Sequence, residues 1–95
     1  RVAAPDDIWL STGYQRANAY VAVHQFHGMP YQDYFAAFES IVDNVGGRPH
    51  WGKMHTLHAD VLRARYPRFD DFLAVRAAVD PDGLFGNAYL DQVLG

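Results

Sequence analysis

The most regular pattern in the sequence is an apolar stripe that begins at residue 31. Aromatic and aliphatic side chains recur there at offsets of 0, 3, 4, 7, 10 and 11, namely Tyr31, Tyr34, Phe35, Phe38, Ile41 and Val42. This period is that of one face of an α-helix, and such a face needs a partner layer. The helix should end between Asn44 and Gly47, because glycine readily adopts the left-handed conformation of a helix C-terminus.

Shorter patterns flank this helix. Residues 17–27 are rich in β-formers and predict an interior strand, with Gly28 ending it. Two further helices are expected at about 59–66 and 69–79, the first closed by Pro67, and residues 80–83 form a turn. This order of elements predicts an α+β fold, a fragment of an antiparallel sheet covered on one face by about three helices.

Composition narrows the class of protein. A chain of 95 residues allows one small domain at most, and a net charge of −3 argues against a general nucleic-acid binder. The absence of cysteine removes disulfides, thiolate catalysis and Cys-based zinc sites. No apolar run approaches the roughly 18 residues of a membrane span, so the sequence contains no transmembrane segment and leaves a cytoplasmic or membrane-associated location open.

The segment "GGRPHWGKMH", residues 46–55, has no helical or strand period. Lys53 is the only lysine in a chain whose other basic residues are arginines, which suggests a compact ammonium with a specific task. His50 lies beside Trp51, whose indole could wall a pocket or stack on a planar ring. The alternatives are that Lys53 is a solvated surface lysine, that Trp51 fills the core, and that His50 binds a backbone carbonyl.

The histidines and the paired carboxylates are further candidate sites. His24 and His27 should point to opposite faces of the expected strand, and His55 and His58 could share a helix face but lack an HExxH frame and a third ligand. We therefore predict no metal site. The pairs Asp6–Asp7 and Asp70–Asp71 sit at a turn and at a helix start, where capping explains them better than acid–base catalysis.

Three motifs taken together resemble a known family. "GGRPHWGK", the Tyr66–Pro67 pair and "DPDGLFGNAYLDQVLG" at residues 80–95 resemble the C-terminal region of the aldonolactone oxidoreductases. These are the L-gulono-1,4-lactone and D-arabinono-1,4-lactone oxidases and dehydrogenases, with the related alditol oxidases, all flavoproteins of the vanillyl-alcohol-oxidase type. The resemblance implies FAD as cofactor and an N-terminal FAD-binding domain that is absent from this chain. Residues 1–95 would be the C-terminal part of the substrate (cap) domain.

The resemblance also implies roles for particular residues. Arg1 would be the arginine of a Glu-x-Arg pair, and Arg1 and Lys53 would be catalytic and would also bind the substrate. His24 would bind the substrate, and His50, Trp51 and Asn87 would lie against the cofactor, with capping of a terminal turn as the alternative for Asn87. Hydride transfer from an alcohol carbon to flavin N5 needs cations near the oxygen that becomes negative.

The substrate and the acceptor stay open at this point. Alditol-oxidising relatives carry a pocket threonine in the segment corresponding to residues 20–27, where this chain has His24, Gln25 and Phe26, and this favours a sugar lactone. The electron acceptor could be oxygen or a redox protein. Alternatives to the lactone enzyme are an alditol oxidase, a protein-interaction module, and a subunit that supplies a substrate pocket in trans.

Overall fold

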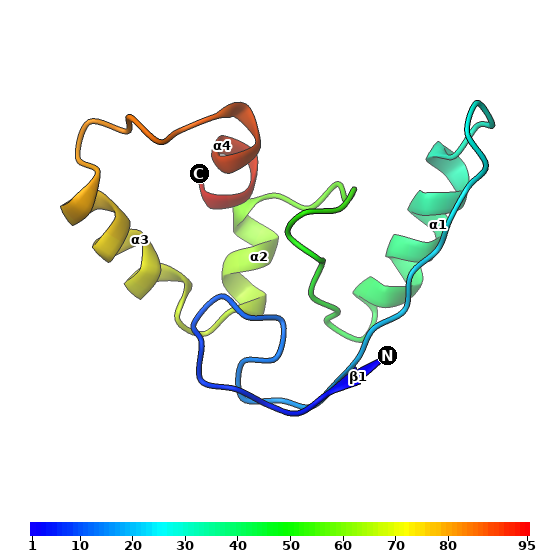
Figure 1. Cartoon of the computed structure of the whole chain (residues 1–95), viewed down its shortest axis with the longest axis horizontal. Helices are drawn as coiled ribbons and strands as arrows, with labels where there is room; N and C mark the ends of the chain where they lie inside the picture. The colour runs from blue at the N-terminus through cyan, green and yellow to red at the C-terminus, as the bar shows by residue number, and fades with distance from the viewer.

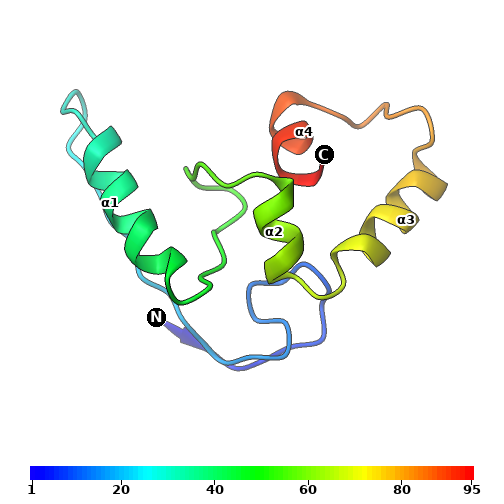
Figure 2. The same ribbon diagram turned by 180° about the vertical axis from the view of Figure 1, so that it is seen from behind.

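The computed structural model describes all 95 residues. Its elements, in chain order, are β1 (Val2–Ala3), β2 (Asn18–Ala19), α1 (Gln32–Asp43), α2 (Ala59–Arg65), α3 (Phe69–Val79) and α4 (Ala88–Leu94). Helices α2, α3 and α4 lie on one side of the molecule and α1 lies apart from them, with the segment that joins α1 to α2 between the two groups (Figure 1, and from behind in Figure 2). The α+β class and the antiparallel pairing are as predicted.

Local signals account for the limits of α1 and α2. At the end of α1, Gly46 adopts a φ of +61°, and the N–H of Gly47 donates to the carbonyl of Val42 at 3.0 Å, as expected of a glycine stop. Tyr66, the residue before Pro67, is extended and ends α2. These helix limits agree with the predicted ranges to within a residue or two.

The core is small and lies where α2, α3 and α4 meet. Its five buried residues are Leu62, Tyr66, Phe69, Val93 and Leu94. All five come from residues 62–94, so the first two thirds of the chain contribute only half-buried side chains to this cluster. Helix α4 supplies two of the five and was not predicted.

The predicted interior strand at residues 17–27 is wrong. The ladder pairs only Val2 with Ala19 and Ala3 with Asn18, and residues 20–27 belong to no strand. A strand needs a neighbouring backbone for its N–H and C=O groups, and β1 is only two residues long. The side chains of residues 20–27 therefore follow no alternation between two sheet faces.

Two details of α3 also differ from expectation. The sequence pattern groups Val79 with Phe69, Phe72 and Leu73 on one side of the helix, but Val79 is 75% exposed at the last turn. Asp70 and Asp71 lie in the first turn without capping it; they form ion pairs with Arg63 and Arg68 instead. Arginines outside the helix reach these carboxylates more readily than the carboxylates reach the helix's own N–H groups.

The molecule exposes more surface than its size requires. Its accessible area is 6934 Å², whereas a compact monomer of 10.7 kDa exposes about 5,500 Å². Its radius of gyration is 14.8 Å, against about 12.4 Å for a compact domain of this length. Helix α1 has no buried residue, and Tyr34 and Ile41 of its apolar stripe are 46% and 68% exposed. The stripe predicted from the sequence is present, with three of its six side chains exposed and the other three half-buried.

None of the four helices has the length and apolar character needed to cross a bilayer.

Candidate functional site

The segment between α1 and α2 is irregular, and arginines fix the backbone at its start. Arg16 donates to the carbonyl of Gly46 at 3.2 Å, and Arg65 donates to that of Gly47. A side chain at Gly47 would overlap that of Val42, so only glycine allows this close approach. We call residues 48–57, which follow this start, the anchored loop.

Arg48 joins the anchored loop to two other segments. Its Nε donates to the carbonyl of Arg65 at 2.9 Å, and its Nη1 donates to the carbonyls of Thr12 and Tyr14 at 3.2 and 3.0 Å. Its guanidinium also lies 4.7 Å from the centre of the Tyr66 ring. Burial, and then the neighbouring charge of Arg16, lower the pKa of Arg48. The group remains a cation with a structural task, because arginine does not lose its proton in proteins.

Trp51 fastens the middle of the loop to the core. Its indole N–H donates to the carbonyl of Leu10 at 2.8 Å, and its ring lies 5.2 Å from that of Tyr66. The interpretation of Trp51 as a core residue is therefore supported. The same side chain also borders a cavity of about 240 Å³ together with Leu10, Ser11, Thr12 and His50.

Two further contacts hold the end of the loop. The carboxylate of Glu39, on α1, accepts from the N–H of Thr56 at 2.9 Å and from its hydroxyl at 2.5 Å. Tyr89, on α4, donates its hydroxyl to the carbonyl of Trp51 at 2.6 Å and lies 3.0 Å from Nε2 of His55. The loop is thus tied to α1 on one side and to α4 on the other.

Between these anchors, residues 50–53 form an exposed turn. The N–H of Lys53 donates to the carbonyl of His50 at 3.0 Å, and the N–H of Gly52 donates to Nδ1 of His50 at 3.0 Å. His50 therefore binds a backbone amide, where the alternative interpretation expected a carbonyl. The side chain of Lys53 is exposed and makes no hydrogen bond or ion pair, so its ammonium is free to meet a ligand.

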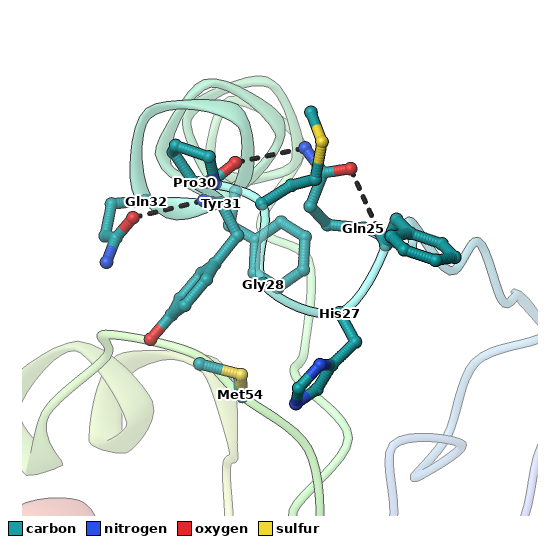
Figure 3. A pocket seen from close by; sticks show the side chains of 10 residues that line it. Gln25, His27, Gly28, Pro30, Tyr31, Gln32 and Met54 are labelled. Carbon is teal, nitrogen blue, oxygen red and sulfur yellow. Dashed lines mark hydrogen bonds between the residues drawn. The ribbon is translucent and has the colours of Figure 1, made fainter.

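A groove of about 620 Å³ opens beside this turn. Met54 lies on one side, facing Tyr31 and His27 across the opening (Figure 3). The other lining residues are Gln25, Phe26, Gly28, Met29, Pro30, Gln32 and Phe35. This volume is in the range of small-molecule sites, which run from about 300 to 1,000 Å³.

The far wall of the groove is a short reversal of the chain. Gly28 has a φ of +83°, and the N–H of Met29 donates to the carbonyl of Phe26 at 3.1 Å. Gln25 closes the reversal by donating from Nε2 to the carbonyl of Pro30 at 3.0 Å, as Figure 3 shows. Because Gln25 follows His24 and Met54 follows Lys53, the groove lies next in sequence to two residues assigned to the substrate.

The structure gathers some of the predicted residues and not others. His50, Trp51 and Lys53 share one turn, and Asn87 begins α4, the helix whose Tyr89 contacts that turn. Arg1 extends the β-ladder, where its carbonyl accepts from Tyr20, and its side chain is exposed. His24 is also exposed, in the segment after β2. No hydrogen bond or ion pair joins the side chain of Arg1 or His24 to the turn.

Asn87 has an observed structural role. Its Oδ1 accepts from the N–H of Leu90 at 3.0 Å at the N-terminus of α4, which confirms the capping alternative. Sequence reasoning missed His55 and Glu39 as contacts of the loop, because their partners lie 34 and 17 residues away.

The histidines and acidic residues form no cluster of three or more that could hold a metal ion. His55 and His58 do not share a helix face, because α2 begins after both, at Ala59. The ring of His55 instead contacts that of Tyr89, edge to face, with 5.9 Å between centres.

Known proteins match this chain over its whole length. The model of the family described as D-arabinono-1,4-lactone oxidase matches residues 1–93. An L-gulono-1,4-lactone dehydrogenase of Mycobacterium tuberculosis H37Rv is 54% identical over 95 residues, which are 100% of this chain and 22% of that protein. An L-gulonolactone oxidase of Bos taurus is 40% identical over 98% of the chain, and an alditol oxidase of a Streptomyces species is 38% identical over 99%.

The chain is an α+β segment, and the relatives that it matches are named as oxidases and dehydrogenases. It belongs to the D-arabinono-1,4-lactone oxidase family. The chain spans about 22% of the length of the curated relatives that it matches first.

Proposed function

We propose that this chain is the C-terminal part of the substrate domain of an FAD-dependent oxidoreductase that oxidises a sugar 1,4-lactone. The observation that carries the proposal is the free ammonium of Lys53, exposed at the tip of a loop that is otherwise fixed on every side. The ammonium stabilises no part of the fold, and it lies beside a groove on a loop whose backbone is held by hydrogen bonds. Such a cation is suited to bind a ligand.

The residues around the turn fit a flavin. The ammonium of Lys53 and Nε2 of His50 have no protein partners, and the cavity at His50 and Trp51 adjoins them. The chemistry that a flavin would supply there is the acceptance, at N5, of the hydride from the alcohol carbon of the substrate. We assign His50 and Trp51 to the cofactor side of the site. Asn87 joins them through the Nδ2 group that capping leaves free.

Lys53 would serve the oxygen of the reacting alcohol. When the hydroxyl proton leaves to solvent, negative charge grows on that oxygen, and a nearby ammonium stabilises it until the carbon gives up its hydride and the carbonyl forms. Arg1 would supply a second cation, and His24 would bind another substrate hydroxyl. These two assignments require the rest of the protein to bring Arg1 and His24 toward the turn, because this segment by itself does not join them.

The exposed part of the apolar stripe of α1 supports the proposal that this chain is a segment of a larger protein. The molecule exposes roughly 1,400 Å² more than a compact monomer of its mass, which exceeds the ~800 Å² that one partner contributes to a standard interface. We propose that an FAD-binding domain, outside these 95 residues, lies against this surface. The segment alone would then be inactive.

Oxidation of an alditol is the second candidate, because the Streptomyces alditol oxidase matches 99% of the chain. The L-gulono-1,4-lactone dehydrogenase and the L-gulonolactone oxidase match at higher identity, so the lactone is preferred. The final electron acceptor is oxygen or a redox protein.

The test is a visible absorption spectrum of the complete protein under nitrogen. A yellow protein whose flavin absorption bleaches with L-gulono-1,4-lactone supports the proposal. γ-Butyrolactone is the matched control, because it has the lactone ring but no hydroxyl group to oxidise. Bleaching by a polyol but not by the lactone would favour the second candidate, oxidation of an alditol. A colourless protein would overturn the proposal. The rate of reoxidation by air then separates an oxidase from a dehydrogenase.

A further inference from the structure

A chain of hydrogen bonds runs from the backbone after the turn, through two side chains, to the backbone inside it. The N–H of Leu57 donates to Nδ1 of His55 at 3.2 Å, and Nε2 of His55 lies 3.0 Å from the hydroxyl of Tyr89. That hydroxyl lies 2.6 Å from the carbonyl of Trp51. Of these residues only Trp51 belongs to the site assigned above, and it enters the chain of bonds through its backbone carbonyl.

Proton counting fixes the direction of each bond. A tyrosine hydroxyl has one proton, and Tyr89 must give it to the carbonyl of Trp51, which can only accept. The hydroxyl therefore accepts from His55, whose proton is on Nε2. Nδ1 is then free of a proton and accepts from Leu57. Every donor and acceptor is used once, and His55 is neutral.

The tyrosine at the centre of this chain stands on a rigid support. Asn87 caps the start of α4, and Val93 and Leu94 near its end are buried in the core. Tyr89 and Val93 are four residues apart and so lie on the same side of the helix. The carbonyl of Trp51 is thereby linked to the core by a bond that does not depend on the loop itself.

We propose that Tyr89, oriented by His55, is a positioning residue that holds the turn carrying Lys53 by fixing the carbonyl group of Trp51 to α4. Lys53 is only two residues beyond that carbonyl, and no hydrogen bond or ion pair of its side chain restrains it. The effect of this restraint on flavin reduction rests on the proposed function. The restraint of the turn itself does not rest on it and can be measured separately.

The test compares the complete protein with its Tyr89→Phe variant, which keeps the ring and removes the hydroxyl. Hydrogen–deuterium exchange of peptides covering residues 50–57 should become roughly 3- to 10-fold faster, the loss of about one hydrogen bond. The limiting rate of anaerobic flavin reduction by L-gulono-1,4-lactone should fall about 10-fold or more, because displacement of a reacting group is costly. The lactone concentration at half-saturation and the melting temperature should change little.

Tyr66→Phe is the matched control. It removes the hydroxyl of another tyrosine near Trp51, but that hydroxyl is buried and has no hydrogen-bond partner. Exchange of residues 50–57 should then stay at the wild-type rate.

Two variants of His55 test its two hydrogen bonds one at a time. In His55→Gln the side-chain amide can donate toward Tyr89 as Nε2 does, and in His55→Asn the side-chain oxygen can accept from Leu57 as Nδ1 does. If His55 acts through Tyr89, glutamine should preserve slow exchange at residues 50–53 better than asparagine.

Unchanged exchange at residues 50–57 in Tyr89→Phe would overturn the inference. So would faster exchange spread over residues 59–95 with a matching fall in melting temperature, because Tyr89 would then be a structural residue only. If the complete protein lacks flavin or ignores the lactone, the proposed function fails, while the exchange comparison still decides whether Tyr89 restrains the turn.

Discussion

The indole N–H of Trp51 donates a 2.8 Å hydrogen bond to the carbonyl of Leu10, 41 residues earlier in the chain. Two residues further on, the side chain of Lys53 has no partner at all. Trp51 therefore belongs to the structural part of the anchored loop. Lys53, two residues later, belongs to the part that is available to a ligand.

Lys53→Met should slow flavin reduction in the complete protein by about 10² to 10³, as expected for the loss of one group that stabilises a developing negative charge. The melting temperature should stay the same, because the exposed side chain makes no hydrogen bond or ion pair in the fold. Lys53→Arg should recover the rate only in part, since a planar guanidinium cannot replace a compact ammonium. Anaerobic stopped-flow reduction measures the effect. Reduction of Lys53→Met at the wild-type rate, with flavin bound, would remove Lys53 from the site.

Asn87→Ala should lower the free energy of unfolding by about 1 kcal/mol, because Leu90 loses its capping acceptor. Turnover should fall in both Asn87→Ala and Asn87→Asp, because both variants lose the Nδ2 group that is assigned to the cofactor. Asn87→Asp should stay as stable as the wild type, since aspartate also caps well. Wild-type turnover in Asn87→Asp would remove Asn87 from the cofactor side of the site.

Arg48→Lys should lower the free energy of unfolding by about 2 kcal/mol, because a single ammonium cannot reach the carbonyls of both Arg65 and Tyr14. Arg76→Lys, on α3, is a matched change at an arginine without an ion pair, and it should have little effect. Urea denaturation of the two variants measures the difference. Equal midpoints would show that the bonds of Arg48 add nothing to stability.

His55 should make stability depend on pH near neutrality. Burial lowers the pKa of His55 below its ordinary value of 6.5, while Glu39 acts to raise it and His58 to lower it. The folded protein thus keeps His55 neutral where the unfolded chain binds a proton. The stabilising effect is present above pH 6.5 and is lost as the pH falls through the folded pKa.

The measurement for His55 is the difference in melting temperature between the wild type and His55→Gln from about pH 8 to 5. The difference should shrink as the pH falls, and the titrations of the other groups cancel because both proteins share them. A difference that is constant over this range would contradict the expectation.

The isolated 95-residue chain should be marginally stable or should associate, because the α1 stripe and the edge of the short β-ladder are exposed. Sedimentation velocity at several concentrations, with thermal unfolding, tests this. A monomer at every concentration with one sharp transition would show that the exposed stripe needs no partner.

Local rules account for the parts of the fold that could be predicted. The helices α1, α2 and α3 follow from apolar periods and from glycine or proline signals at their ends. Helix α4 was missed, although Asn87 as a cap and apolar residues at Tyr89, Leu90, Val93 and Leu94 are the signal that would have found it. The strand at residues 17–27 was wrong because β-propensity does not supply a neighbouring strand.

The candidate site was predictable only in part. Its turn was recognised from composition and resemblance, since glycine, tryptophan and a single lysine are unusual together. The contacts that hold it were not, because Glu39 to Thr56 and His55 to Tyr89 join residues far apart in sequence. Such pairs follow no period and depend on how the helices pack.

The five buried residues of the core and the residues around Gly28 belong to separate parts of the chain. Exchanging Gln25, Phe26, Met29 or Gln32 for other side chains leaves every core contact in place. Sequence divergence is therefore least harmful to folding in the stretch that forms the far wall of the groove. That wall can therefore be remodelled for molecules of different shape without disturbing the core that supports the anchored loop.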